Sequence, residues 1–356
     1  MSNSGPGSLE LFCHEVTVRF LEKAIVPPYE GSMIRGAFGR AFKESCCPFP
    51  HDGAGCPLGE RCPYGYVFET SPPEEARDFA KNKEVPRPYV FEPPEATKME
   101  YEPGEKMRFG FTVVGRAAQY MPYFVYAISK MGDEGVGRLR ARYELDGISA
   151  RNPLTGAAEE VFDGETVKNR RLPTGWEDAV EAAWGLEGEQ VRLEFLTPAF
   201  VKFRGEVSPE APSFAALVQG LLIRLPMLSA VHCGEVWRAD FRNLVEKARE
   251  VETVRDETTW ASFRRHSSFK NRVETLEGIV GRVEYAGPLE EFLPLLVMGG
   301  LAHVGKRAVF GLGRYRITRP DAPLSLPKAL SASSKWERIE YPKAEKVQEG
   351  IKQNAE

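Results

Sequence analysis

The sequence predicts an α+β protein made of two tandem ferredoxin-like (RRM-like) domains, with a cysteine-rich insertion in the first domain. Its 356 residues exceed one small domain and suit two domains of about 150 residues each. The order strand, helix, strand, strand, helix, strand can be read twice along the chain, and this order describes a ferredoxin-like domain. Residues 120–145 also align without a gap on residues 292–317, so we expect one unit of helix, glycine turn and strand to be used twice.

Turn signals and composition divide the chain. We expect an N-terminal domain at 10–150 with the cysteine-rich insertion at 46–70, and a C-terminal domain with a glycine-rich loop at 189–320. Residues 151–188 contain paired turn signals and are interpreted as a hairpin extension and linker. Residues 321–356 are rich in Pro, Ser, Lys and Glu, which predicts a poorly packed tail.

The first domain begins with a strand at 11–25, in which apolar and polar residues alternate. A helix follows from Ser32, because Ile34, Phe38 and Phe42 recur at a spacing of four. The further expected elements are a short strand at 89–92, a strand at 106–115, the helix of the repeated unit and a strand at 139–148.

The second domain repeats this order. Its expected elements are a strand at 191–203, a helical region at 214–248 interrupted at Pro226, strands at 260–266 and 276–285, a helix at 289–302 and a strand at 313–317. The repeated unit pairs Pro122 with Pro294, Val125 with Val297, Arg142 with Arg314 and Tyr143 with Tyr315. In its first copy, Arg138, Arg140 and Arg142 are expected on one face of the final strand.

The composition is that of an ordinary soluble protein, with 42% hydrophobic residues. There is no run of about 18 apolar residues, and the N-terminus lacks the basic and apolar regions of a signal peptide, so we expect a cytoplasmic protein without membrane partners. The net charge of −4 argues mildly against non-specific nucleic-acid binding. A local basic groove is still possible, because salt screens charges beyond about 10 Å.

Four cysteines lie close together in a segment rich in Pro and Gly. They are Cys46, Cys47, Cys56 and Cys62. In a reducing compartment such a cluster indicates a metal more often than disulfides, and four thiolates, or three with His51, complete a structural Zn²⁺ site. An iron–sulfur cluster and unligated thiols remain alternatives.

The segment at 303–317 combines glycines with basic residues. Gly305, Gly311 and Gly313 lie between an apolar helix and a strand, and glycines let a phosphate approach the backbone closely. No acidic residue occurs between Glu291 and Asp321, as is typical of an anion site. The basic residues there are Lys306, Arg307, Arg314, Arg316 and Arg319. A glycine turn with solvated arginines is the alternative.

Two regions resemble a known family. The segment TTWASFRRHSSFKNRVETLEGIVGRVEYAGPLEEFLPLLVMGGLAHVGKRAVFGLGRYRI resembles the C-terminal signature of the CRISPR-associated endoribonucleases that process precursor CRISPR RNA, members of the RAMP superfamily. GSMIRGAFGRAF and CPYGYVFE are similar to the N-terminal half of that family. His266 stands where the family pattern has a tyrosine, so a family role for that position is in doubt.

The resemblance implies contacts with RNA and cleavage of the CRISPR repeat without a catalytic metal. The residues expected at the RNA are Arg264, Arg265, His266, Lys270, Arg272, Gly305, Lys306, Arg307, Gly311 and Gly313. Such a cut needs deprotonation of a ribose 2′-hydroxyl, stabilisation of charge on the phosphate and protonation of the leaving 5′-oxygen. The products would be a 2′,3′-cyclic phosphate and a 5′-hydroxyl.

Three residues are candidates for that chemistry. His303 precedes the glycine loop, although a histidine at a helix C-terminus is also stabilised by the helix dipole. His51 follows the first helix and is alternatively a zinc ligand or a surface residue. Tyr29 could position a 2′-hydroxyl or pack on the core.

The expected function is therefore the metal-independent cutting of precursor CRISPR RNA into mature guide RNAs, with Zn²⁺ in a structural role only. The alternative is a non-catalytic RAMP-type subunit that holds processed RNA among other CRISPR effector subunits. A zinc-stabilised RNA-binding module unrelated to CRISPR is a third possibility. The sequence contains no nucleotide-triphosphatase or nucleophilic-hydrolase motif.

Overall fold

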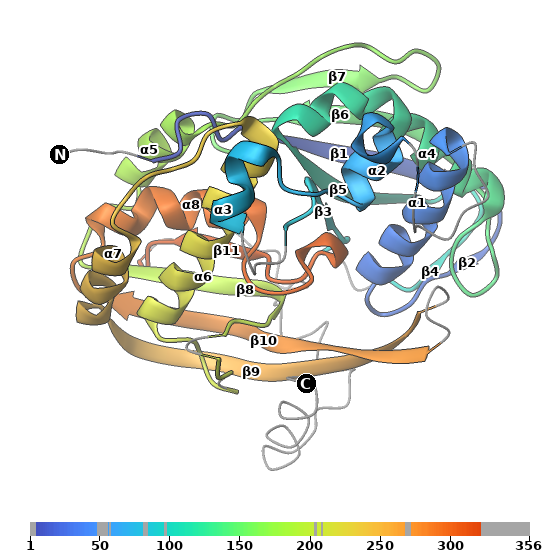
Figure 1. The fold of residues 1–356 in the computed structure, drawn as a ribbon. Coiled ribbons are helices and arrows are strands. Elements are labelled where there is room, and N and C mark those ends of the chain that lie inside the picture. Colours follow the sequence, from blue (N-terminus) through green and yellow to red (C-terminus); the bar gives the residue numbers. More distant parts are fainter. Residues whose placement is uncertain are drawn as a thin grey trace.

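Two antiparallel sheets, each covered by helices, form the main body of the protein (Figure 1). The computed structural model of the chain describes residues 5–47, 56, 58–80, 85–95, 98–202, 205–207, 209–267 and 272–321. His51 and Lys270 lie outside these residues, as do most of the segment between Cys47 and Leu58 and the predicted tail beyond Asp321.

The first domain has the ferredoxin-like strand order. Its strands are β1 (Leu11–Phe20), β3 (Tyr89–Glu92), β5 (Lys106–Val114), β6 (Tyr143–Arg151) and β7 (Ala158–Phe162). They lie in the order β3-β5-β1-β6-β7, so β7 extends the usual four strands at one edge. Two helices, α1 (Gly31–Cys46) and α4 (Met121–Glu134), pack side by side over this domain.

The second domain has the same topology. Its strands are β8 (Gln190–Ala199), β9 (Glu252–Ser267), β10 (Arg272–Ala286) and β11 (Tyr315–Thr318), in the order β11-β8-β10-β9. The crossing helices are α6 (Phe214–Leu228) and α8 (Leu293–Ala302). The prediction of two ferredoxin-like domains is therefore confirmed.

Shorter elements connect and extend the two units. They are β2 (Ala24–Ile25), which pairs with β4 (Glu100–Tyr101), and the helices α2 (Pro63–Phe68), α3 (Arg77–Ala80), α5 (Trp176–Trp184) and α7 (Phe241–Lys247). The segment predicted as hairpin and linker, 151–188, contributes to both domains. Its strand β7 joins the first sheet, whereas Trp176, Ala179 and Ala183 of α5 are buried in the second core.

Two predicted boundaries were wrong for identifiable reasons. Pro226 lies inside α6 without ending it, and the helical run instead ends after a π-helical turn, at Gly234 in the left-handed region. The proline removes one N–H donor and crowds the carbonyl four residues earlier, but the apolar side chains of α6 are buried on both sides of it and their packing keeps the helix continuous. The strand predicted from residue 139 begins at Tyr143, because residues 137–140 form a tight turn.

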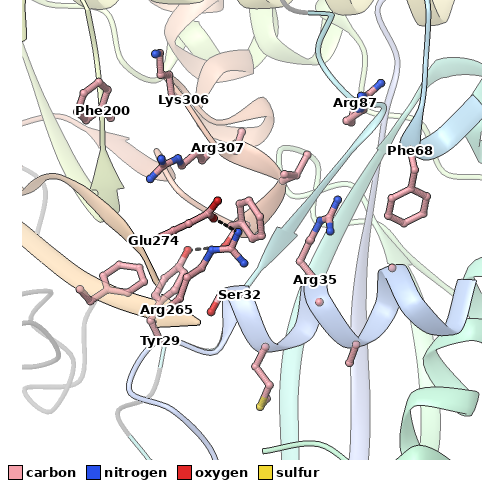
Figure 2. A pocket seen from close by; sticks show the side chains of 18 of the residues that line it. Tyr29, Ser32, Arg35, Phe68, Arg87, Phe200, Arg265, Glu274, Lys306 and Arg307 are labelled. Carbon is pink, nitrogen blue, oxygen red and sulfur yellow. Dashed lines mark hydrogen bonds and ion pairs between the residues drawn. The ribbon is translucent and has the colours of Figure 1, made fainter. Parts of the chain in front are cut away.

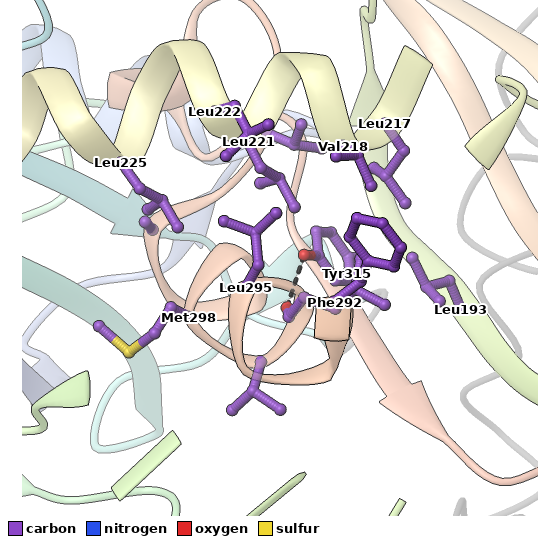
Figure 3. Packing of buried hydrophobic residues seen from close by; sticks show 14 of the residues in the cluster. Leu193, Leu217, Val218, Leu221, Leu222, Leu225, Phe292, Leu295, Met298 and Tyr315 are labelled. Atoms are coloured by element: carbon purple, nitrogen blue, oxygen red, sulfur yellow. Dashed lines mark hydrogen bonds between the residues drawn. The ribbon is translucent and has the colours of Figure 1, made fainter. Parts of the chain in front are cut away.

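The second core is formed mainly where α6 crosses α8 (Figure 3). Leu221 and Leu225 of α6 point toward Leu295 and Met298 of α8, and all four are buried. The window Phe214–Cys233 is long and apolar enough to span a membrane by composition, with mean hydropathy 1.7. However, 78% of that window is buried inside the protein, which is the environment of a core helix.

Candidate nucleic-acid interface

A cleft of about 2090 Å³ lies between the two domains. The first domain contributes one face of α1 and the α2 region, and the second contributes one side of α6, the end of β9, the start of β10 and residues 305–310. Figure 2 shows Arg35, Arg87 and Phe68 on one side and Lys306 and Arg307 on the other. The cleft therefore brings together segments that are more than 200 residues apart in the chain.

Basic side chains dominate the lining. They are Arg35, Arg40, Lys43, Arg87, Arg140, Lys202, Arg224, Arg264, Arg265, Arg272, Lys306 and Arg307. Among the residues that the structure describes, the carboxylates of the lining are those of Glu69 and Glu274. A concave surface with such an excess of positive charge focuses a field that attracts polyanions, although the whole chain carries a net charge of −4.

Guanidinium groups and aromatic rings alternate across the floor of the cleft. Arg35 lies 5.4 Å from the ring centre of Phe68 and 5.3 Å from that of Phe310. Arg265 covers the same Phe310 ring at 4.3 Å and forms a 2.5 Å ion pair with Glu274. Each cation–π contact contributes about 0.5 to 2 kcal/mol. The alternation couples α1 to the 3₁₀ turn at Ala308–Phe310 and holds both cations at fixed positions.

The glycines of the predicted loop serve different contacts. Gly305 lines the cleft, but Gly311 and Gly313 are buried. A Cβ on Gly313 would lie 1.8 Å from the carbonyl oxygen of Val304, and one on Gly311 would lie 2.6 Å from that of Phe91. Both glycines have φ values in the left-handed region. Gly311 thus permits close backbone packing between the domains, and Gly313 permits it within the loop.

The three arginines after the loop do not form the expected anion site. Arg314 pairs with Glu92 at 3.1 Å and with Glu95 at 3.2 Å. Arg316 pairs with Glu95 and lies 3.7 Å from Glu194, and Arg319 pairs with Asp321. None of these arginines lines the cleft. Glu92, Glu95 and Glu194 come from distant strands and loops, so the absence of acidic residues between Glu291 and Asp321 was misleading for Arg314 and Arg316.

His303 is not positioned for catalysis in this structure. Its side chain is fully buried, it does not line the cleft, and its Nδ1 is 3.1 Å from the carbonyl oxygen of Leu312. Burial lowers the pKa of His303 well below its usual value, and the charges of Arg314 and Arg224 lower it further. The imidazole is therefore neutral and inaccessible to RNA, which contradicts its selection as a catalytic candidate.

Tyr29 does line the cleft, but its hydroxyl is used structurally. The hydroxyl donates a hydrogen bond of 2.6 Å to the carbonyl oxygen of Phe310, and the ring packs on Phe263 at 4.6 Å between centres. Only 3% of the residue is exposed, and burial raises the pKa of its hydroxyl well above the usual value. The structure therefore places Tyr29 as a link between the first domain and the loop of the second.

Among the side chains that the structure describes, the other histidines do not reach the cleft. His14 and His232 are buried, and burial lowers the pKa of each to about 4. His232 lies 3.0 Å from the hydroxyl of Tyr66 and 2.8 Å from the carbonyl oxygen of Pro86. The backbone of His266 lies in β9. Among the described side chains, no histidine lines the cleft.

The predicted RNA contacts are partly brought together. Arg264, Arg265, Arg272, Lys306 and Arg307 all line the cleft together with Gly305. The sequence analysis missed the basic residues Arg35, Arg40, Lys43, Arg87, Arg140, Lys202 and Arg224. The spacing of Arg35, Gly36, Gly39, Arg40 and Lys43 on one face of α1 could have revealed part of this set. Arg87, Arg140 and Lys202 lie in loops or turns and carry no periodic signal, and Arg224 is a single cation in the largely apolar helix α6.

The surroundings of Cys46 and Cys62 bear on whether these cysteines can bind a metal. Burial raises the pKa of the Cys46 thiol to about 12, and the nearby Cys62 adds to this effect. Cys62 caps α2, where its sulfur accepts the N–H of Gly65 at 3.2 Å, a contact that suits a thiolate ligand. Within the described parts of the chain, no group of three or more ligating side chains is assembled. The zinc site therefore stays a prediction.

Comparison with known families identifies the class of protein. Residues 9–174 match a family model described as an N-terminal domain, and residues 193–315 match the model of the CRISPR-associated endoribonuclease Cas6. None of the curated proteins compared with the chain matches it. The Cas6 model thus lies over the second of the two ferredoxin-like domains. Residues 193–315 match the Cas6 endoribonuclease model, and solved Cas6 structures share the fold of most of the chain.

Solved structures share the fold at low sequence identity. Cas6 of Thermus thermophilus is 14% identical, with a TM-score of 0.51, and the match covers 87% of this chain and 99% of that one. A Cas6 product complex is 15% identical with the same TM-score and coverage. A chain of a partial Cas6-RT-Cas1–Cas2 complex is 14% identical, with a TM-score of 0.56. The match covers 97% of this protein but only 57% of the length of that chain.

Proposed function

We propose that the chain binds the repeat of precursor CRISPR RNA in the interdomain cleft. The supporting observation is the lining itself, in which twelve basic side chains face two carboxylates. Aromatic rings are interleaved with these cations, as in surfaces that hold RNA strands by phosphate contacts and base stacking. Those rings include Tyr64, Phe68, Phe200 and Phe310.

We further propose that the bound repeat is cut at one phosphodiester by its own 2′-hydroxyl, with 2′,3′-cyclic phosphate and 5′-hydroxyl ends as products. Arg35, Arg265 and Arg307 would stabilise the charge that develops on the phosphate. In the described lining, Glu274 is engaged by Arg265 and Arg272, which leaves few carboxylates to hold a catalytic Mg²⁺. His51, which lies outside the described residues, is the remaining histidine candidate for proton transfer.

The second candidate function is a non-catalytic subunit that holds CRISPR RNA. The observation that favours it is the lack of a described histidine side chain in the cleft. Affinity needs only cations and stacking surfaces, whereas cleavage also needs a group that moves protons near neutral pH. The two functions therefore differ in one side chain and share the same cleft.

End-labelled repeat RNA, incubated with the protein in excess EDTA, tests the proposal. We expect a single cut, and we expect the upstream product to resist phosphatase until acid opens its cyclic phosphate. Circular dichroism under the same conditions is the control for folding. Tight binding without any cut would support the non-catalytic subunit instead, and no preference for repeat RNA over an unrelated RNA would refute both functions.

Other CRISPR proteins are proposed as partners. The chain shares its fold with part of a chain in a Cas6-RT-Cas1–Cas2 complex, of which it spans 36% in one structure and 57% in another. We therefore propose that this protein works beside further CRISPR-associated components. Co-purification with the products of neighbouring genes would test this, with the isolated chain at the same concentration as the control.

A structural zinc ion is proposed for the cysteine-rich segment. Cys46 and Cys62 are close to each other, and Cys47 and Cys56 lie between them in the chain. A bound Zn²⁺ would join the end of α1 to the start of α2. Elemental analysis should find about one zinc per chain, and Cys46→Ser should abolish it. Cys233→Ser should keep it, and a metal-free protein of unchanged thermal stability would refute the proposal.

A further inference from the structure

The first domain carries its own counterpart of the glycine loop. The segment 135–142 joins α4 to β6, as residues 303–314 join α8 to β11. Gly135, Val136, Gly137 and Arg140 line the same cleft as residues 305–310. The function proposed above counts Arg140 among the cations of the lining but assigns no specific role to this segment.

The segment is held rigidly by its backbone. Val136 and Ala141 exchange two N–H···O hydrogen bonds of 2.9 Å, which close a four-residue turn at 137–140. The N–H of Arg138 donates to the carbonyl oxygen of Ile25 at 2.8 Å. A Cβ on Gly137 would lie 2.5 Å from the same oxygen. The turn is therefore fixed on β2 and presents its tip with little freedom.

The tip consists of two arginines on either side of a leucine, and all three are exposed. Leu139 has 52% of its surface accessible and is flanked by the two arginines, so its apolar side chain is open to a ligand. Arg140 has φ of 54°, a left-handed conformation that is unfavourable for a non-glycine residue. The chain thus keeps a long cation where glycine or asparagine would fit the backbone better.

Nearby carboxylates do not neutralise these two arginines. Glu134 pairs with Arg40 at 3.0 Å, and Glu22 pairs with Arg142 at 2.8 Å. Among the described residues, neither Arg138 nor Arg140 has an ion-pair partner. Two exposed guanidinium groups at the edge of a cleft already rich in cations raise the local attraction for a polyanion.

We propose that the turn at 137–140 is a second RNA-binding point, at which Arg138 and Arg140 bind backbone phosphates and Leu139 packs on the face of an unpaired base. This inference rests on the proposed RNA binding in the cleft. Guanidinium groups suit phosphate oxygens because of their fork of N–H donors. An apolar side chain between them suits the flat face of a base that is not stacked in a helix. The RNA would extend from the Lys306 side of the cleft across α1 to this turn.

The test compares two double variants of equal charge. Arg138→Ala with Arg140→Ala removes the proposed contacts, whereas Arg170→Ala with Arg171→Ala removes two exposed arginines that do not line the cleft. Binding is measured by fluorescence anisotropy with repeat RNA that carries 2′-O-methyl groups, which 2′-hydroxyl attack cannot cut. The first double variant should lower the slope of log affinity against log salt by about two units, one per phosphate contact, and the control should not.

Leu139→Ala provides an independent measurement. It should weaken binding without changing the salt slope, because an apolar contact releases no counterions. Val167→Ala, another exposed apolar residue away from the cleft, is its control. Unfolding midpoints of all variants show whether the fold is kept.

Two results separate this inference from the proposed function. Suppose that Lys306→Ala weakens binding, but that the double variant at Arg138 and Arg140 has the same affinity and salt slope as the control double variant at Arg170 and Arg171. The RNA then does not reach the turn, and the inference is wrong. The same conclusion follows if both pairs weaken binding equally, since that would reflect overall charge only. If the wild-type protein itself shows no preference for repeat RNA, the proposed function fails first.

Discussion

The two loops that join the second helix of each domain to its last strand begin alike and end differently. α4 is followed by Gly135 with φ 75° and ψ 147°, and α8 is followed by His303 with φ 64° and ψ 160°. In both units the tyrosine that opens the last strand donates a 2.6 Å hydrogen bond back to its helix. Tyr143 bonds the carbonyl oxygen of Ile128, and Tyr315 bonds that of Leu296.

The difference is one helical turn. α4 has 14 residues and α8 has 10, and the loop after α8 is longer by the same four residues. The gap-free alignment of the two units keeps their helix starts and their strands in register for this reason. The last helical turn of α4 has no counterpart in α8, where the equivalent residues belong to the loop. The loop of the second unit is therefore long enough to reach Tyr29 and Phe91 of the other domain.

The first unit shows what the shorter loop can do. Its turn closes on itself and remains at the edge of the cleft, with exposed cations at its tip. The longer loop places its first half, 305–310, along the cleft and buries its second half between the domains. Length, rather than the number of glycines or arginines, therefore decides whether such a loop joins the two domains.

The largest expected effect concerns proton transfer. It tests whether the turn that begins at His303, which is unwound in the second domain, takes part in catalysis. His51→Ala should reduce the single-turnover cleavage rate by a factor on the order of 10² to 10⁴ and leave repeat-RNA affinity nearly unchanged. His303→Gln should keep the wild-type rate, because the buried imidazole does not reach the cleft. A loss of cleavage in the His303 variant at unchanged stability would make the unwound turn part of the active site.

The next effect tests the close packing that the longer loop requires. Gly313→Ala should lower the free energy of unfolding by about 3 kcal/mol, since its Cβ would meet the Val304 carbonyl oxygen at 1.8 Å. Gly156→Ala is the matched control, with a similar φ of 77° and no atom within 4 Å. It should cost about 1 kcal/mol. If urea unfolding shows equal decreases in the free energy of unfolding for both variants, the positive φ alone accounts for the cost and the contact with Val304 does not.

A smaller effect separates the two halves of the loop. Lys306→Ala with Arg307→Ala should lower the salt slope of RNA binding by about two units. Arg316→Ala with Arg319→Ala should leave the slope unchanged, because those side chains pair with carboxylates outside the cleft. Anisotropy titrations at several salt concentrations measure both. Equal slopes in the two variants would place the RNA elsewhere.

The smallest effect is a pH dependence of stability. Burial lowers the pKa of His303 below the ordinary value of 6.5, so the unfolded chain binds the proton more readily. Stability is complete above pH 6.5 and falls as the pH decreases, by at most about 1.4 kcal/mol per pH unit for this group. His303→Gln should flatten the decline between pH 7 and pH 5. An unchanged decline would assign it to His14 and His232.

Local patterns in the sequence were enough to predict the architecture. Alternating residues in β1 and β5, and the spacing of Ile34, Phe38 and Phe42 in α1, lead directly to strands and a helix, because each element must bury one face. Their order then restricts the topology. The cations of the first half of the glycine loop were also found, since glycine and charge are local signals.

Tertiary structure alone decided which charges face the cleft and which histidines reach it. Arg314 and Arg316 looked available in the sequence but meet Glu92, Glu95 and Glu194, which approach from other strands and loops. His303 follows a helix and precedes a glycine and two cations, yet it is fully buried against the carbonyl oxygen of Leu312. Pairing and burial depend on residues far apart in the chain, and no local pattern encodes the distance between them.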